Sequence, residues 1–175
     1  MAMKSTDQAL SITDDSGLLA IVDVARYAPF VGEDWTYEQI LDHFAKGTSA
    51  KTILAWECGD GGDEYCVVVR SGFTTETGFR EVSGAIESST GMLHLVSYAA
   101  LTMAAQFDDE RLPSKHEAHL LFRVPPGSVR IRLVQMFDPS SLVRPNDGQP
   151  HFVIEVQPGD GPAWSGVAWE SAKHI

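Results

Sequence analysis

The stretch TILAWECGDGGDEYCVVVR, residues 52–70, decides the fold class. Two apolar runs lie on either side of Gly61-Gly62, and glycine supplies the positive φ that a tight two-residue β-turn needs. A hairpin that turns there pairs Cys58 with Tyr65 and brings six apolar side chains to one face: Leu54, Trp56, Cys58, Tyr65, Val67 and Val69. The stretch therefore predicts antiparallel strands with one buried face.

A second stretch, HLLFRVPPGSVRIRLV (residues 119–134), has the same form. Pro126-Gly127 is typical of a type II turn. A hairpin centred there places six apolar side chains on one face: Leu120, Phe122, Val124, Val129, Ile131 and Leu133. Its other face carries Arg123 directly opposite Arg130, with Arg132 two residues along. Because like charges that face each other destabilise a strand pair, we expect an anion beside this arginine cluster, either an internal carboxylate or a bound ligand or partner.

The rest of the chain has the same pattern of short apolar runs separated by turn residues, which is typical of β-strands. We expect nine strands, at these positions: Leu10–Thr13, Leu18–Val24, Thr52–Cys58, Tyr65–Arg70, Phe79–Glu87, Met92–Ser97, His119–Val124, Val129–Phe137 and Phe152–Val156. Strands do not alternate with long helices, which disfavours a doubly wound fold. The predicted class is α+β, predominantly antiparallel β, as a two-sheet sandwich or half-open barrel with one or two short helices.

One helix is well marked, at Tyr37–Lys46. Thr36 and Gln39 form a T-x-x-Q capping box, after which apolar residues recur at helical spacing. Gly47 is a natural helix terminator. A second helix is expected at Tyr98–Phe107, capped by Ser97, although that stretch could also prolong the strand before it.

Length and composition fit one globular domain. The chain has 175 residues, of which 43% are hydrophobic and 21% charged, and this is enough to bury a core without metal or disulfide support. We expect residues 1–175 to form a single domain, with residues 1–8 and 170–175 as frayed tails.

Acidity is the strongest compositional signal. The chain has 24 acidic and 13 basic residues, a net charge of −11, which argues against non-specific binding to nucleic acid or to an anionic membrane. The first residues carry no secretory signal and no apolar run is long enough to span a bilayer, so we expect a cytoplasmic protein. Residues 1–88 hold 15 acidic and 6 basic residues, net −9. We therefore expect this half to carry the partner-facing surface.

The two cysteines are predicted to be free thiols. Cytosolic cysteines stay reduced, and the hairpin register points Cys58 and Cys66 to opposite faces, where no disulfide can join them. Their spacing also matches no zinc or redox motif.

No motif predicts a catalytic residue, a metal or a cofactor. His116-Glu117-Ala118-His119 is one residue short of the H-E-x-x-H zinc motif, and two imidazoles at that spacing on a strand face opposite ways. The carboxylate runs Asp14-Asp15, Glu33-Asp34 and 108–110 lie in polar turn contexts and are predicted to be solvated.

Two further surfaces are candidates for binding. The turn residues Asp60, Asp63 and Glu64 form an acidic, partner-facing group, although solvation of a turn also asks for such residues. Trp164 and Trp169 could anchor an interface, because aromatic residues often do so, or could pack on the core from a last strand.

The leading hypothesis is an acidic interaction protein that binds another, basic protein. In size and charge the chain resembles bacterial immunity proteins, which sequester toxic enzymes with basic active sites, and an acidic field steers a basic partner. The first alternative is a small-molecule or anion-binding β module, or an enzyme, that uses Arg123, Arg130 and Arg132. The second alternative is a structural subunit that oligomerises through an exposed sheet edge.

Overall fold

The computed structural model describes every residue except 1–6, 60–62, 144, 146–147 and 171–175. It contains two mostly antiparallel sheets and two helices, so the predicted α+β class and the sandwich are confirmed. The five-stranded sheet has the order β1-β4-β9-β8-β5, with bounds Gln8–Asp14, Asp63–Ser71, Phe152–Pro158, Gly127–Gln135 and Arg80–Ser88. The four-stranded sheet has the order β3-β2-β6-β7, with bounds Ile53–Glu57, Leu18–Val22, Met92–Ser97 and Leu121–Arg123. Within these sheets only the β4–β9 pair is parallel.

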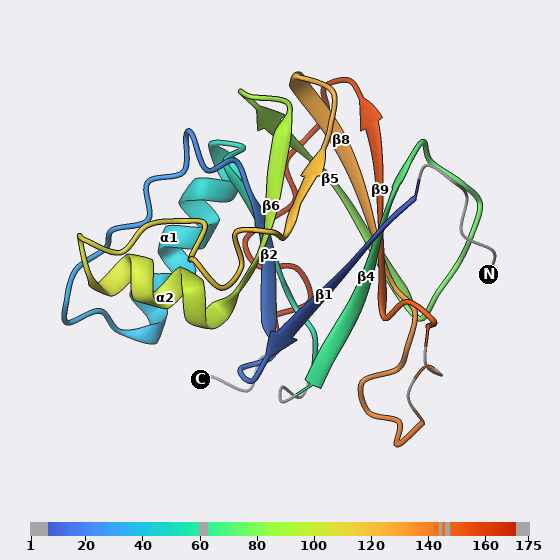
Figure 1. Cartoon of the computed structure of the whole chain (residues 1–175), viewed down its shortest axis with the longest axis horizontal. Helices are drawn as coiled ribbons and strands as arrows, with labels where there is room; N and C mark the ends of the chain where they lie inside the picture. Colours follow the sequence, from blue (N-terminus) through green and yellow to red (C-terminus); the bar gives the residue numbers. More distant parts are fainter. Residues whose placement is uncertain (1–6, 60–62, 144, 146–147, 171–175) are drawn as a thin grey trace.

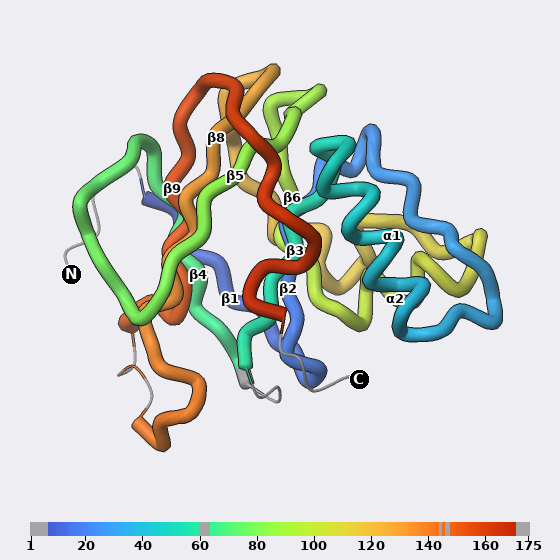
Figure 2. Tube along the Cα trace, turned by 180° about the vertical axis from the view of Figure 1, so that it is seen from behind, coloured from blue at the N-terminus to red at the C-terminus, as the bar shows by residue number. Residues whose placement is uncertain are grey.

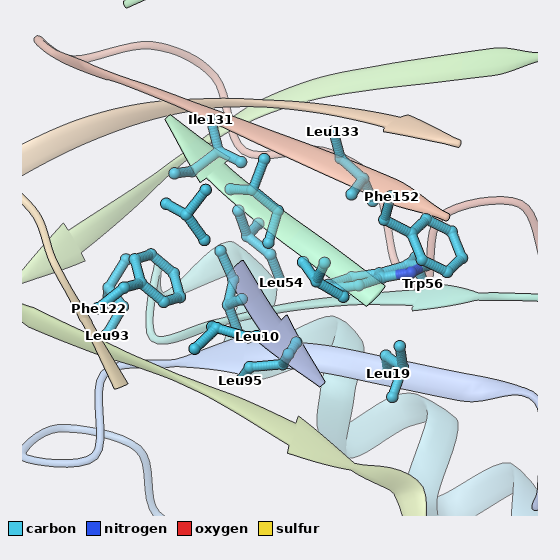
Figure 3. Packing of buried hydrophobic residues seen from close by; sticks show 14 of the residues in the cluster. Leu10, Leu19, Leu54, Trp56, Leu93, Leu95, Phe122, Ile131, Leu133 and Phe152 are labelled. Atoms are coloured by element: carbon cyan, nitrogen blue, oxygen red, sulfur yellow. The ribbon is translucent and has the colours of Figure 1, made fainter. Parts of the chain in front are cut away.

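The elements form three layers, which Figure 1 shows from the side. The two sheets pack face to face, and residues such as Trp56, Phe122 and Phe152 fill the space between them (Figure 3). Helices α1 (Tyr37–Ser49) and α2 (Tyr98–Gln106) cover the outer face of the four-stranded sheet, with Ile40 and Phe44 packed in a second core. Neither helix of the described part of the chain covers the outer face of the five-stranded sheet (Figure 1).

Both predicted hairpins are wrong. Strand β3 pairs with β2, whereas β4 pairs with β1 and β9 in the other sheet. In the same way β7 pairs with β6, and β8 pairs with β5 and β9. The apolar side chains assigned to the two hairpin faces do share one core, but they meet across the sandwich. Alternation identifies the buried face of a strand; it does not distinguish a neighbour about 5 Å away in the same sheet from one about 10 Å away in the facing sheet.

Both helices lie where the sequence predicts them, and the Thr36–Gln39 capping box is present. Helix α1 does not end at Gly47, however, but continues to Ser49. A Cβ atom at Gly47 would lie 2.6 Å from Cγ2 of Ile53, so this glycine permits close packing of the helix on β3 rather than ending the helix. Neither helix of the described part is long and apolar enough to cross a membrane.

The C-terminal segment closes one side of the sandwich. After β9 it runs across β5 towards β3, as Figure 2 shows, and Ala168 forms a β-bridge with Trp56. At the other end of the chain, Gln8 begins β1 and Asp7 forms an ion pair with Arg70. Of the predicted tails, residues 1–8 and 170–175, Gln8 belongs to β1, and residues 1–6 and 171–175 lie outside the described residues.

Both cysteines are free, as predicted. Cys58 is fully buried and Cys66 is half-buried, and burial raises the pKa of both thiols. We expect a thiol reagent to label the native protein slowly and only at Cys66, because the thiolate is the reactive form and Cys58 is inaccessible. Mass spectrometry should find one adduct on the native protein and two after unfolding. Two adducts before unfolding, or a gain of two hydrogens on reduction, would contradict this arrangement.

Candidate functional site

The predicted arginine cluster does not form, because its members lie in different sheets. Arg123 is on β7 opposite Met92, whereas Arg130 and Arg132 are on β8. Arg130 is exposed, with its guanidinium 5.2 Å from the centroid of the Phe73 ring. Arg132 is only 8% exposed and is fully engaged with internal partners. The expected opposition of Arg123 and Arg130 is therefore wrong.

Arg132 belongs to a buried polar network on the outer face of the five-stranded sheet. Its Nε donates to Glu81 Oε2 at 2.5 Å and its Nη1 to Glu155 Oε1 at 2.5 Å. Its Nη2 donates to the carbonyl oxygen of Glu76 at 2.5 Å. This network supplies the internal carboxylates that the sequence analysis gave as one alternative, so Arg132 serves the fold.

Glu155 is the centre of the network and is 0% exposed. It lies in register with Arg70 on one side and with Arg132 on the other. Its carboxylate also accepts hydrogen bonds from the N–H and the hydroxyl of Thr74, which holds the β4–β5 loop (residues 72–79) over the sheet. Burial alone would raise the pKa of Glu155, but the hydrogen bonds from Thr74 and Arg132 outweigh burial and lower it.

The three acidic turn residues are not one described site. Asp60 lies outside the described residues. Asp63 begins β4 and is paired in register with Asp14 of β1. Glu64 is exposed and its carboxylate accepts a hydrogen bond from the Ser11 hydroxyl.

The carboxylate runs divide by environment. Residues 33–34 and 108–110 are exposed as predicted. Asp14, however, is 2% exposed and accepts hydrogen bonds from the N–H groups of Gly17 and Leu18. The prediction that its carboxylate is solvated is therefore wrong. Burial raises the pKa of its carboxyl despite these bonds. Glu117, from the zinc-like sequence, accepts hydrogen bonds from the N–H and hydroxyl of Ser97 and so fixes the start of α2.

The two candidate tryptophans, Trp164 and Trp169, occupy different environments, and neither lies in a strand. Trp164 is buried in the core against Gly84 of β5. Trp169 is half-buried, and its ring lies 4.3 Å from the guanidinium carbon of Arg80. Core packing, the second of the two alternatives, therefore describes Trp164, and Trp169 packs against the edge of the same core.

An apolar surface lies at the C-terminal end of α2. Phe30, Met103 and Phe107 are 51%, 44% and 37% exposed, and we call these three residues the α2 patch. The N–H groups of Val31 and Gly32 both donate to the carbonyl oxygen of Ala105, which fixes Phe30 beside the end of the helix. Large exposed apolar groups held together in this way are typical of interaction surfaces.

Acidic residues lie close to the α2 patch in the sequence. Two short exposed runs supply them: Glu33 and Asp34, which begin three residues after Phe30, and Asp108, Asp109 and Glu110, which directly follow Phe107. Arg111 is the basic residue of this segment, and its Nη1 donates to the backbone carbonyl oxygens of Asp108 and Glu110. The two acidic runs come from different halves of the chain, residues 33–34 from the first half and residues 108–110 from the second.

A groove continues from the patch along α2. It has a volume of about 650 Å³ and lies between α2 and residues 110–117, with Met103 and Glu110 among its lining residues. The α2 patch thus lies beside a concave surface whose charged lining is mixed, with Arg111 and Lys115 as well as Glu110 and Glu117.

Phe30, Met103 and Phe107 are not among the candidate residues that the sequence predicts. A signal for two of them is present, because Phe30 stands three residues before Glu33 and Phe107 immediately before Asp108. An aromatic residue at the border of an acidic turn has little chance of burial in the core. Met103 carries no such signal, since the pattern of α2 alone does not say which side of a short apolar helix faces solvent.

Comparison with known proteins gives a likeness of fold. No family model and no curated protein matches the chain. One solved structure, described as crocagin biosynthetic gene J, is 16% identical with a TM-score of 0.56, over 90% of this chain and 99% of its own. Another is ComJ from Bacillus subtilis, an inhibitor of the DNA degrading activity of NucA, at 13% identity and a TM-score of 0.50, over 86% of this chain and 94% of its own. At these identities the likeness establishes the three-layer fold.

Proposed function

We propose that this chain is a protein-binding protein of the inhibitor type, which covers a basic, partly apolar surface of another protein with the α2 patch. The observation that carries the proposal is the patch itself, three exposed apolar side chains with five exposed acidic residues close to them in the sequence. The proposal includes a cytoplasmic location, in line with the two free thiols.

Two further observations support it. ComJ, which shares the fold over nearly its whole length, is an inhibitor of the DNA degrading activity of NucA, and proteins that act on DNA have basic substrate-binding surfaces. Fold alone does not assign a function, so this support is by analogy. The net charge of −11 is independent of the fold and favours association with a basic surface.

The two parts of the surface have different roles in this proposal. The carboxylates attract the partner from a distance and so raise the association rate, which falls as salt screens them. Phe30, Met103 and Phe107 then lose water against the partner and slow dissociation, because buried apolar anchors carry most of the binding energy of an interface.

We expect the triple variant Phe30→Ser, Met103→Ser, Phe107→Ser to bind its partner about thirtyfold more weakly or worse, a loss of about 2 kcal/mol. The partner is first captured from a lysate with the wild-type chain and then purified, and its affinity is measured for each variant. The matched control is Leu142→Ser, Val143→Ser, since these residues are also exposed and apolar but lie on the loop at the far end of the molecule from the helices (Figures 1 and 2).

The proposal is supported if the partner is basic, the control binds normally, and raising salt from about 0.05 M to about 0.5 M slows wild-type association. Equal loss in the control and the triple variant would contradict the assignment to α2. The acidic turn is tested beside it, because loss on Glu64→Ser with normal binding by the triple variant would move the interface to β4. Sedimentation that shows a wild-type dimer and a monomeric triple variant would instead make the patch a self-association surface.

A further inference from the structure

A cavity opens at the end of the sandwich where β7 of one sheet lies near the ends of β1, β4 and β9 of the other. Its volume is about 530 Å³, within the range of small-molecule sites. Apolar side chains form most of its wall: Val69, Met92, Leu121, Phe122, Pro125 and Val156. Gln8 closes part of this wall, because its side-chain Nε2 donates to the carbonyl oxygen of Leu121 at 2.9 Å and so links β1 to β7.

The charged groups at this cavity are basic. Arg70, Arg123 and His119 line it, and none of the lining residues within the described part of the chain is acidic. This contrasts with a chain in which acidic residues outnumber basic ones by 24 to 13. The cavity is thus a local basic site in an acidic protein.

The basic groups differ in how far they are already neutralised. Arg70 is 7% exposed, and its Nη1 donates to Glu76 at 2.8 Å while its Nη2 lies 3.5 Å from Asp7. Arg123 is exposed and makes no ion pair with any residue that the structure describes. The fork of the Arg123 guanidinium, with His119 beside the same cavity, is therefore available to an incoming anion.

We propose that this cavity binds a small organic carboxylate with an apolar body. The guanidinium of Arg123 takes the carboxylate in a bidentate contact, which is the geometry that arginine favours. The apolar part of the ligand then covers Met92, Leu121 and Pro125, the part-exposed apolar residues of the lining. This activity does not depend on the α2 patch, because none of the three patch residues lines the cavity.

Octanoate is a suitable probe, since it has a carboxylate and an unbranched apolar chain. We expect calorimetry to detect octanoate binding, with octanamide at least about tenfold weaker because it lacks the charge. Arg123→Gln should lower octanoate affinity by about tenfold or more, whereas the matched control Arg130→Gln should leave it unchanged, since Arg130 is an exposed arginine that does not line the cavity.

Methionine methyl signals in an NMR spectrum locate the ligand. Octanoate should shift the Met92 methyl signal, because Met92 lines the cavity, and leave that of Met103 in the α2 patch in place. A shift of Met103 instead, equal affinity for octanamide, no octanoate binding, or equal loss in both arginine variants would each overturn the proposal. Tighter binding of inorganic phosphate than of octanoate would also overturn it, because the apolar wall would then have no role. These readouts need no partner protein, so their failure is separate from failure of the proposed function.

Discussion

Replacing Glu155 with glutamine is expected to lower the free energy of unfolding by about 3 kcal/mol, measured by urea denaturation at neutral pH. The substitution keeps the size of the side chain but removes the charge that Arg132 Nη1 contacts at 2.5 Å. Because Glu155 is 0% exposed and Arg132 is 8% exposed, water cannot replace the lost carboxylate. Arg132 keeps its contacts with Glu81 and with the Glu76 carbonyl oxygen, but loss of the buried member of a buried charge pair is among the most destabilising outcomes of a single substitution.

Glu81→Gln is the matched control, since Glu81 contacts the same guanidinium from a side chain that is 51% exposed. Solvent screens that pair, so the control should lose less than about 1 kcal/mol of unfolding free energy.

The pH dependence of stability gives a second check. The pKa of Glu155 in the folded protein lies below its ordinary value of 4.5, so its contribution is present above that pH and disappears as pH falls through the folded pKa. The difference in unfolding free energy between wild type and Glu155→Gln should therefore decrease as the pH falls. Equal losses of unfolding free energy in Glu155→Gln and Glu81→Gln at neutral pH would contradict the role of burial.

The sequence predicted all nine strands and both helices, but not the pairing of the strands that follow each other in the two quoted stretches. Strands β3 and β4 show why. Trp56 and Val67 both point into the core, as alternation requires, but β3 belongs to the four-stranded sheet and β4 to the five-stranded sheet. A glycine-rich turn permits a tight hairpin without enforcing it, and the pairing is decided by strands distant in sequence, such as β9 beside β4.

Contacts between segments distant in sequence also decide which of the candidate sites form. The predicted arginine cluster required β7 to pair with β8, and it does not form because these strands lie in different sheets. The cavity at Arg123, in contrast, forms from strands that are far apart in the sequence. Glu155 alternates with buried valine and isoleucine in β9 and so has the pattern of a solvated position. Its burial comes from the β4–β5 loop, through Thr74, and no local pattern records a contact across 81 residues. Acidic turns at residues 33–34 and 108–110, in contrast, are local features, and their exposure was predictable.

Replacing Trp164 with alanine is expected to cost about 3 to 5 kcal/mol of unfolding free energy, the usual range for removing a buried aromatic side chain. Trp164 is 7% exposed and belongs to the core between the sheets. A Cβ atom at Gly84 would lie 2.9 Å from the Trp164 backbone nitrogen and 3.3 Å from its ring. The sequence therefore has glycine on β5 at the place where the C-terminal segment crosses that strand, and the ring fills the space that would otherwise open to solvent.

Trp169→Ala is the matched control, because Trp169 is half-buried and lies over the Arg80 guanidinium at 4.3 Å. A cation–π contact at such a site contributes about 0.5 to 1 kcal/mol, so the control should lose clearly less stability than Trp164→Ala. Urea denaturation of both variants, with partner affinity measured on the folded protein, separates the two roles that the sequence left open. If Trp164→Ala unfolds like wild type but loses partner binding, this tryptophan anchors an interface rather than the core. If it is destabilised and its folded fraction still binds, the C-terminal segment holds the two sheets together and the partner-facing surface lies elsewhere.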